Sequence, residues 1–147
     1  MSGKYTDVTL YSDGSCLRNP GPGGWASILV CEGHEKILSG GRGKTTNNHM
    51  ELLGVLEGLK ALKYPCKVKV VTDSQYVVNS INKGWLKNWI ARKEIKSRPN
   101  SELWLELIEL MNIHDVEYTW IKGHAGHPFN ERCDKIARTE ASRFDTL

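Results

Sequence analysis

The stretch Val68-Lys69-Val70-Val71-Thr72-Asp73-Ser74 decides the fold class. Its run of β-branched residues predicts a strand buried on both faces, as in a parallel sheet. Asp73 ends that strand, and either Asp73 or Ser74 can cap a helix that begins near Gln75. A strand that leads directly into a helix is the repeating unit of an α/β domain.

Strands and helices expected on either side of this stretch complete the α/β arrangement. Sequence periodicity predicts further strands at residues 8–12, 25–31, 35–39 and 116–121. It also predicts a helix that starts at the capping candidates 46–48 and runs to about residue 63, and further helices at 84–90, 101–111 and 131–142. The segment Asn19-Pro20-Gly21-Pro22-Gly23-Gly24 is expected to be a turn or loop. The element order βββαβα(α)αβα predicts a mixed sheet with helices on both faces.

Size and composition indicate one globular domain spanning residues 1–147, with 39% hydrophobic and 25% charged residues. No apolar run approaches the roughly 20 residues that a membrane-spanning helix needs. Residues 1–7 lack the apolar core of a signal peptide, so we expect a cytoplasmic protein. Four reduced thiols are expected, because the cysteines form no CxxC pair; they are Cys16, Cys31, Cys66 and Cys133.

Residues 83–98 form a basic segment with a single acid, Glu94. The six bases are Lys83, Lys87, Arg92, Lys93, Lys96 and Arg98. Trp85 and Trp89 lie among them, and this mixture suits a polyanion with bases that can stack. A solvated helix face would produce a similar charge run, so this segment alone leaves both interpretations open.

Two acids follow predicted strands, Asp13 after residues 8–12 and Asp73 after residues 68–72. If these strands are parallel neighbours, both carboxylates project into one crevice at the carboxyl edge of the sheet. Each acid alone could equally be a helix cap or a turn former. Glu51 precedes Gly54 and Gly58 on one face of its helix, which predicts that this face lies flat on the sheet. An exposed first-turn glutamate is the alternative for Glu51.

Converging carboxylates repel one another and need a cation to stay ionised together. Carboxylate oxygens select Mg²⁺ or Mn²⁺, and two such ions about 4 Å apart can activate a water and stabilise the leaving oxygen of a phosphodiester. Asp134 is expected in the first turn of the last helix, where its position alone is uninformative.

Five sequence blocks resemble bacterial type 1 ribonuclease H. They are Asp-Gly-Ser at 13–15, Asn-Pro-Gly-Pro-Gly-Gly at 19–24, Thr-Thr-Asn-Asn-His-Met-Glu-Leu at 45–52, Thr-Asp-Ser-Gln-Tyr-Val at 72–77 and Lys-Gly-His-Ala-Gly-His-Pro-Phe-Asn-Glu-Arg-Cys-Asp at 122–134. The resemblance runs in order from about residue 7 to residue 141. It implies the ribonuclease H fold, with a five-stranded mixed sheet, and hydrolysis of the RNA strand of RNA·DNA hybrids to 5′-phosphate and 3′-hydroxyl ends, as in the removal of RNA primers.

The resemblance also implies roles for individual residues. Two Mg²⁺ ions, or Mn²⁺ in their place, would be held by Asp13, Glu51, Asp73 and Asp134. His124 would assist proton transfer or product release, whereas His127 would be structural. The implied substrate contacts are Asn19, Asn47 and Gln75 to the RNA strand, Cys16 and Asn48 in the hybrid groove, Thr46 at a DNA phosphate, and Trp85, Lys87 and Trp89 in a basic protrusion that grips the DNA strand.

This sequence departs from the best-known bacterial pattern between Trp89 and Trp104, where it is a few residues shorter. The resemblance therefore assigns no individual roles to Arg92, Lys93, Lys96 and Arg98. We expect a monomer without an N-terminal hybrid-binding module.

Three other functions compete with hybrid cleavage: a nuclease of the same fold acting on DNA, a non-catalytic nucleic-acid-binding module, and a cation- or nucleotide-binding α/β domain. The asparagine and glutamine set argues against a DNA nuclease, because DNA has no 2′-hydroxyl to contact. The presence of all four acids with His124 argues against a non-catalytic binding module. The lack of a Walker pattern after Gly21 to Gly24 argues against a nucleotide-binding domain.

Overall fold

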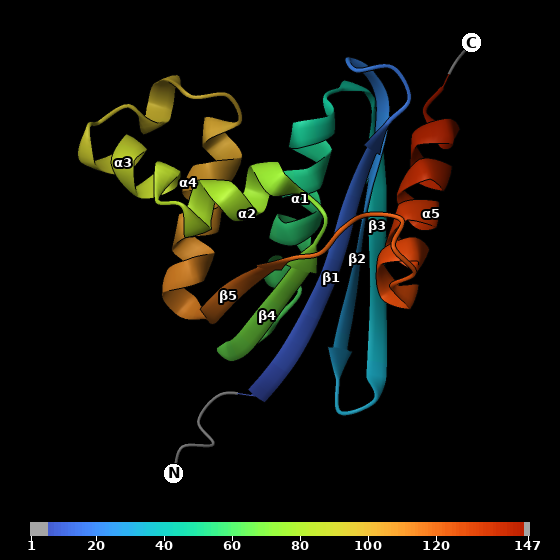
Figure 1. The fold of residues 1–147 in the computed structure, drawn as a ribbon, viewed down its shortest axis with the longest axis horizontal. Helices are drawn as coiled ribbons and strands as arrows, with labels where there is room; N and C mark the ends of the chain where they lie inside the picture. The colour runs from blue at the N-terminus through green and yellow to red at the C-terminus, as the bar shows by residue number, and fades with distance from the viewer. Residues whose placement is uncertain (1–5, 146–147) are drawn as a thin grey trace.

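The computed structural model describes residues 6–145 and contains a five-stranded mixed sheet (Figure 1). The strands are β1 (Thr6–Cys16), β2 (Gly21–Cys31), β3 (His34–Thr45), β4 (Cys66–Thr72) and β5 (Asp115–Trp120), in the order β3-β2-β1-β4-β5. β2 pairs antiparallel with β1 and β3, whereas β4 pairs parallel with β1 and β5. The predicted mixed sheet is confirmed.

Helices cover both faces of the sheet, as predicted (Figure 1). They are α1 (Asn47–Lys60), α2 (Gln75–Asn82), α3 (Trp85–Ala91), a 3₁₀ turn η1 (Ile95–Ser97), α4 (Ser101–Ile113) and α5 (Pro128–Arg143). α5 packs on one face against β1, β2 and β3, while α1 packs on the other face against β1 and β2. Within residues 6–145, no helix is long and apolar enough to cross a membrane.

The two faces of the sheet bury cores of different size. The larger core, on the α1 face, includes Leu10, Leu52, Val70 and Trp104, all fully buried. The smaller core lies under α5 and consists of Ala26, Ile28, Cys133 and Ala137. Trp104 and Leu107 of α4 are fully buried, and all four cysteines are free thiols, as predicted.

Some predicted boundaries are wrong. Residues 21–24 are not a loop, because they form the first part of β2 and pair with β3, Gly24 lying opposite Gly41. Two strands flank this glycine-rich segment and supply the backbone hydrogen bonds that its local sequence does not indicate. The Asn19–Pro20 bond that precedes β2 is cis.

Three other elements also differ from expectation. β4 is buried on both faces only towards its end, since Lys67 and Lys69 are exposed. α1 ends at Lys60 rather than near residue 63. α5 begins at Pro128 rather than residue 131, because proline fits the first position of a helix, where no backbone donor is required.

Candidate active site

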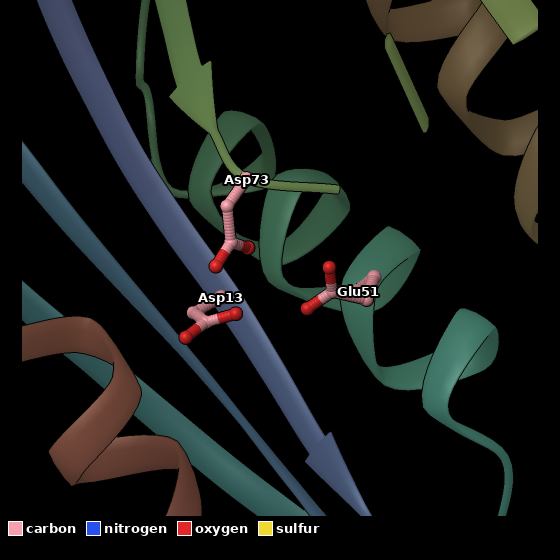
Figure 2. A group of neighbouring side chains, drawn as sticks. All are labelled: Asp13, Glu51 and Asp73. Atoms are coloured by element: carbon pink, nitrogen blue, oxygen red, sulfur yellow. The ribbon is translucent and has the colours of Figure 1, made fainter. Parts of the chain in front are cut away.

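Asp13 of β1, Glu51 of α1 and Asp73, just after β4, point toward one another (Figure 2). One side-chain oxygen from each lies within 4.8 Å of the others. Parallel pairing of β1 and β4 ends at Ser12 and Thr72. Asp13 and Asp73 are therefore the residues that directly follow the two paired segments. The predicted meeting of Asp13 and Asp73 at one edge is thus confirmed.

Asp13 itself does not end its strand, which corrects the predicted boundary. β1 continues to Cys16 along β2, and Asp13 lies opposite Ala26 in that pairing. Asp13 therefore sits where β1 leaves β4 but remains held by β2. The arrangement fixes its backbone on one side and leaves the other side open to Asp73.

Glu51 reaches the cluster because α1 lies directly on β1. Gly14 is essential to this approach, since a Cβ atom there would overlap the backbone of Met50 and Glu51. Its backbone N–H donates to Glu51 Oε1 and also to Asp13 Oδ1, the latter at 2.9 Å. A Cβ on Gly54 would lie 3.2 Å from the carbonyl oxygens of Ala26 and Asp13. The predicted contact of this helix face with the sheet is confirmed, and Glu51 is not an exposed first-turn residue.

The electrostatics of this cluster favour a bound cation. Asp13 and Glu51 are only 4% and 6% exposed. Burial, reinforced by repulsion from Glu51 and Asp73, raises the pKa of Asp13 well above its ordinary value. Burial and the charge of Asp73 likewise raise the pKa of Glu51. A divalent cation would compensate these charges, and an all-oxygen donor set fits a hard ion such as Mg²⁺.

Asp134 stands apart from the three clustered acids. It lies in the second turn of α5, not the first as expected, because the helix begins earlier. Its Oδ2 accepts from Arg138 Nε at 3.0 Å. The three clustered acids nevertheless line a pocket of about 340 Å³ that Asp134 also lines. The other residues of this acidic pocket are Gly14, Ser15, Cys16, Asn47 and His124.

The β5–α5 loop closes one side of this pocket. Trp120 Nε1, at the end of β5, donates to the backbone oxygen of Asp73 at 3.0 Å, and Gly123 lies directly against the Asp73 carboxylate, which a Cβ atom on Gly123 would displace. His124 is exposed and has a left-handed backbone, with φ of 55°. It also lines a second pocket, of about 530 Å³, together with Asp134 and Arg138. His127 precedes α5 without a side-chain capping bond.

The residues expected to contact substrate lie around the same edge of the sheet. Cys16 and Asn47 line the acidic pocket, and the side-chain oxygen of Asn19 accepts from the backbone N–H of Asn47 at 3.1 Å. Thr46 caps α1 by accepting from the backbone N–H of His49 at 3.2 Å. Gln75, at the start of α2, and Asn48 are exposed.

The basic segment forms α3 and η1, on the side of α4 away from α5 (Figure 1). Trp85 and Lys87 are exposed, and Trp85 presents 40% of its surface. Trp89 is partly buried, with its ring centroid 6.0 Å from that of Trp104. The guanidinium of Arg98 lies 4.7 Å from the Trp89 ring. Trp89 and Arg98 therefore contribute to the structure of the segment itself.

Sequence patterns did not identify several residues around the acidic pocket. Gly14, Trp120 and Gly123 position the acids through contacts that join distant parts of the chain. Arg138 could have been found, because it lies four residues after Asp134 on a predicted helix and has the opposite charge.

A mixed sheet that gathers carboxylates at one edge, in a chain that also carries a basic helical segment, fits the class of divalent-metal-dependent nucleases. The chain belongs to the RNase H family, whose model, described as RNase H, matches residues 5–142. It is therefore an endonuclease that hydrolyses phosphodiester bonds, and the predicted resemblance is confirmed.

Relatives in sequence support this assignment. A Ribonuclease H of Nitratidesulfovibrio vulgaris, strain Hildenborough, is 55% identical over 141 residues, which cover 93% of this chain and 90% of the relative. A Ribonuclease H of Sulfurovum sp. is 57% identical over 137 residues, which cover 93% and 92% of the two chains.

Solved structures share the fold. The crystal structure of LC9-RNase H1, described as a type 1 RNase H with the type 2 active-site motif, has a TM-score of 0.81 at 29% identity, covering 97% of this chain and 75% of the other. LC11-RNase H1, solved in complex with an RNA/DNA hybrid, has a TM-score of 0.70 at 20% identity, covering 92% and 97%. The second likeness shows the fold alone.

Proposed function

We propose that this chain cleaves the RNA strand of RNA–DNA hybrids with two Mg²⁺ ions, leaving 5′-phosphate and 3′-hydroxyl ends. The observation that carries the proposal is the cluster of Asp13, Glu51 and Asp73, whose oxygens approach within 4.8 Å although two of the side chains are buried. These three acids would hold the ions, with Asp134 contributing from the margin of the pocket. Bound ions would activate the attacking water and stabilise the leaving oxygen.

His124 is proposed to move a proton or to assist product release. Its side chain lines both the acidic pocket and the adjoining pocket on α5. A histidine that lines both spaces would be able to give a proton to the leaving 3′-oxygen and to meet a departing product phosphate. The polar lining of the second pocket, with Arg132, Lys135 and Arg138, suits a phosphate group.

Selection of RNA is assigned to the amide side chains near the acids. Asn19, Asn47 and Gln75 can both donate to and accept from a 2′-hydroxyl, which DNA lacks. The proposed contacts of Cys16 and Asn48 with the hybrid groove, and of Thr46 with a DNA phosphate, lie beside them. Trp85 and Lys87, exposed on α3, would meet the DNA strand together with the basic segment.

The remaining parts of the proposal concern the cellular setting. We propose that residues 1–147 act as one catalytic domain, as a monomer in the cytoplasm, on RNA primers and other hybrids. The single sheet with helices on both faces, described for residues 6–145, is consistent with one domain. A DNA nuclease of the same fold is the second candidate, and substrate choice separates the two.

Four strand-labelled substrates test the proposal: RNA–DNA hybrid, RNA duplex, DNA duplex and single-stranded RNA. Each is incubated with Mg²⁺, with chelator, and with an Asp13→Asn variant. We expect cleavage of the RNA strand of the hybrid alone, lost with chelator and in the variant. Asp115→Asn, an exposed aspartate at the start of β5, is the matched control and should cleave normally.

Two results would contradict the proposal. Cleavage of the DNA duplex would favour the second candidate. Hybrid binding without cleavage, in Mg²⁺ and in Mn²⁺, would mean that the clustered acids do not form a catalytic centre.

A further inference from the structure

A chain of hydrogen bonds joins β3, α1, α2 and α4 beside the candidate active site. Arg42 Nη1 lies 3.0 Å from His49 Nε2, and His49 Nδ1 lies 2.9 Å from Asn100 Oδ1. Asn100 Nδ2 donates to the Tyr76 hydroxyl at 3.2 Å. Trp104 Nε1 donates to the same hydroxyl at 2.9 Å. These five residues connect segments that are far apart in the sequence.

The two ends of this chain fix the direction of every bond in it. A guanidinium and an indole N–H can only donate. His49 Nε2 must therefore accept from Arg42, which leaves Nδ1 as the nitrogen that donates to Asn100 Oδ1. The amide nitrogen of Asn100 is then free to donate to Tyr76. Replacing His49 removes both the donor to Asn100 and the link to β3.

The elements joined at His49 carry the two kinds of proposed substrate contact. His49 lies on α1 between Asn47 and Glu51, and Tyr76 follows Gln75 on α2. Asn100 directly precedes α4 and lies two residues after the basic segment, with a left-handed backbone and no side-chain capping bond of its own. The bond from His49 to Asn100 thus ties the helix that carries the RNA contacts to the segment that would grip DNA.

We infer that His49 is a positioning residue for the hybrid. By orienting Asn100, it holds the basic segment at a fixed place relative to α1, so that both strands of one duplex are engaged together. This inference rests on the proposed function, since it assumes that the two surfaces bind the two strands. His49 does not line the acidic pocket, so the inference gives a role to a residue outside it.

A purely structural role for His49 would predict a different outcome. The His49 side chain is half-buried rather than part of either core, so its loss should affect stability little. His114 is a useful contrast, because its Nδ1 also makes one hydrogen bond, accepting from the backbone N–H of Cys66 at 3.0 Å. His114 is buried and lies at the opposite edge of the sheet, where β4 and β5 begin.

The test compares His49→Leu, His49→Asn and His114→Leu in the full chain. Fluorescence anisotropy in chelator gives the Kd for an intact hybrid and for single-stranded DNA, and cleavage in Mg²⁺ gives KM and kcat. Because one hydrogen bond contributes about 0.5–1.5 kcal/mol, His49→Leu should raise the hybrid Kd and KM about two- to tenfold and leave kcat within about twofold. His49→Asn keeps a donor near Nδ1 and should recover most of the affinity.

Single-stranded DNA and His114→Leu supply the discriminating controls. The basic segment stays intact in His49→Leu, so the Kd for single-stranded DNA should not change. An unchanged hybrid Kd, an equal loss for single-stranded DNA, or an equal loss in His114→Leu would each overturn the inference. Failure of the wild-type chain to cleave the hybrid would instead contradict the proposed function, so the two failures can be told apart.

Discussion

On the β1 side of the acidic pocket, Asp13 and Glu51 are buried and are held by backbone contacts around Gly14. On the α5 side, Asp134 is half-buried and its carboxylate is paired with the exposed side chain of Arg138, four residues along the same helix. The packing of α1 on β1 fixes the positions of the Asp13 and Glu51 carboxyl groups. The orientation of the Asp134 carboxylate depends instead on a surface ion pair.

This difference separates two properties of the site. Packing on the β1 side brings the carboxyl groups together before any metal ion arrives, and burial makes their ionisation costly until a cation offsets the charge. An exposed ion pair contributes only about 0.2–1 kcal/mol, so Asp134 can exchange Arg138 for another partner at little cost. We therefore expect perturbations on the β1 side to have large effects and those on the α5 side small ones.

The largest effect is expected for Asp13→Asn. A catalytic metal ion contributes several kcal/mol of transition-state stabilisation, so hybrid cleavage should fall by about a thousandfold or more. Single-turnover cleavage rates with excess enzyme measure the loss, and isothermal titration with Mn²⁺ should show weakened binding. Activity within tenfold of wild type would mean that the buried cluster is not the centre of catalysis.

Asp134→Asn should have a smaller effect, because the three clustered acids remain. We expect a loss of about ten- to hundredfold, the range seen when groups that support a metal site are removed. The same single-turnover assay applies. A loss equal to that of Asp13→Asn would show that the two sides of the pocket contribute alike.

Gly14→Ala tests the packing that places Glu51. The added Cβ would meet the backbone of Met50 and Glu51, so α1 must shift away from β1. Overpacking of this kind costs about 1–3 kcal/mol of unfolding free energy. Urea unfolding measures it, and Gly43→Ala, where a Cβ would meet nothing within 4 Å, is the matched control. Equal stability of the two variants would contradict the close approach of α1.

Stability of the metal-free protein should fall as pH rises above about 4. The pKa values of Asp13 and Glu51 are raised from ordinary values of 3.8 and 4.5, so the folded protein retains protons that the unfolded chain has released. Each linked proton gives a slope of at most about 1.4 kcal/mol per pH unit. Urea unfolding between pH 5 and 8 should show this decline, and saturating Mg²⁺ should reduce it. A rise in stability over that range would contradict the raised pKa values of Asp13 and Glu51.

The smallest effect is expected for Arg138→Gln. Freeing Asp134 from an exposed ion pair should strengthen Mn²⁺ binding about twofold, as measured by calorimetry. Lys135→Gln removes an equal charge from the second pocket, which Arg138 also lines, and Arg143→Gln breaks the Arg143–Glu140 pair elsewhere on α5. The gain should disappear in an Asp134→Asn background. A gain that persists there would reflect net charge rather than the pairing.

Local sequence signals predicted those features whose causes are local. The strand that precedes Asp73 and the two helix glycines after Glu51 favoured a common site for three acids but left a helix cap, a turn or an exposed glutamate open, and the resemblance to ribonuclease H decided between them. The start of β2 at Gly21 was not predictable, because a proline- and glycine-rich segment becomes a strand only when neighbours pair with it on both sides. The position of Asp134 and the partners of His49 depend on how distant helices pack, and no local pattern encodes that.

Trp89 and Trp104 have a consequence for spectroscopy. Two indoles at 6.0 Å and a 68° interplanar angle should couple their electronic transitions and give a near-ultraviolet circular dichroism signal. Such signals vanish when fixed packing is lost, even where helices remain. Because Trp104 is fully buried and Trp89 belongs to α3, this signal would show whether the basic segment is docked on α4. The chain thus carries its own optical label for that contact, without any added dye.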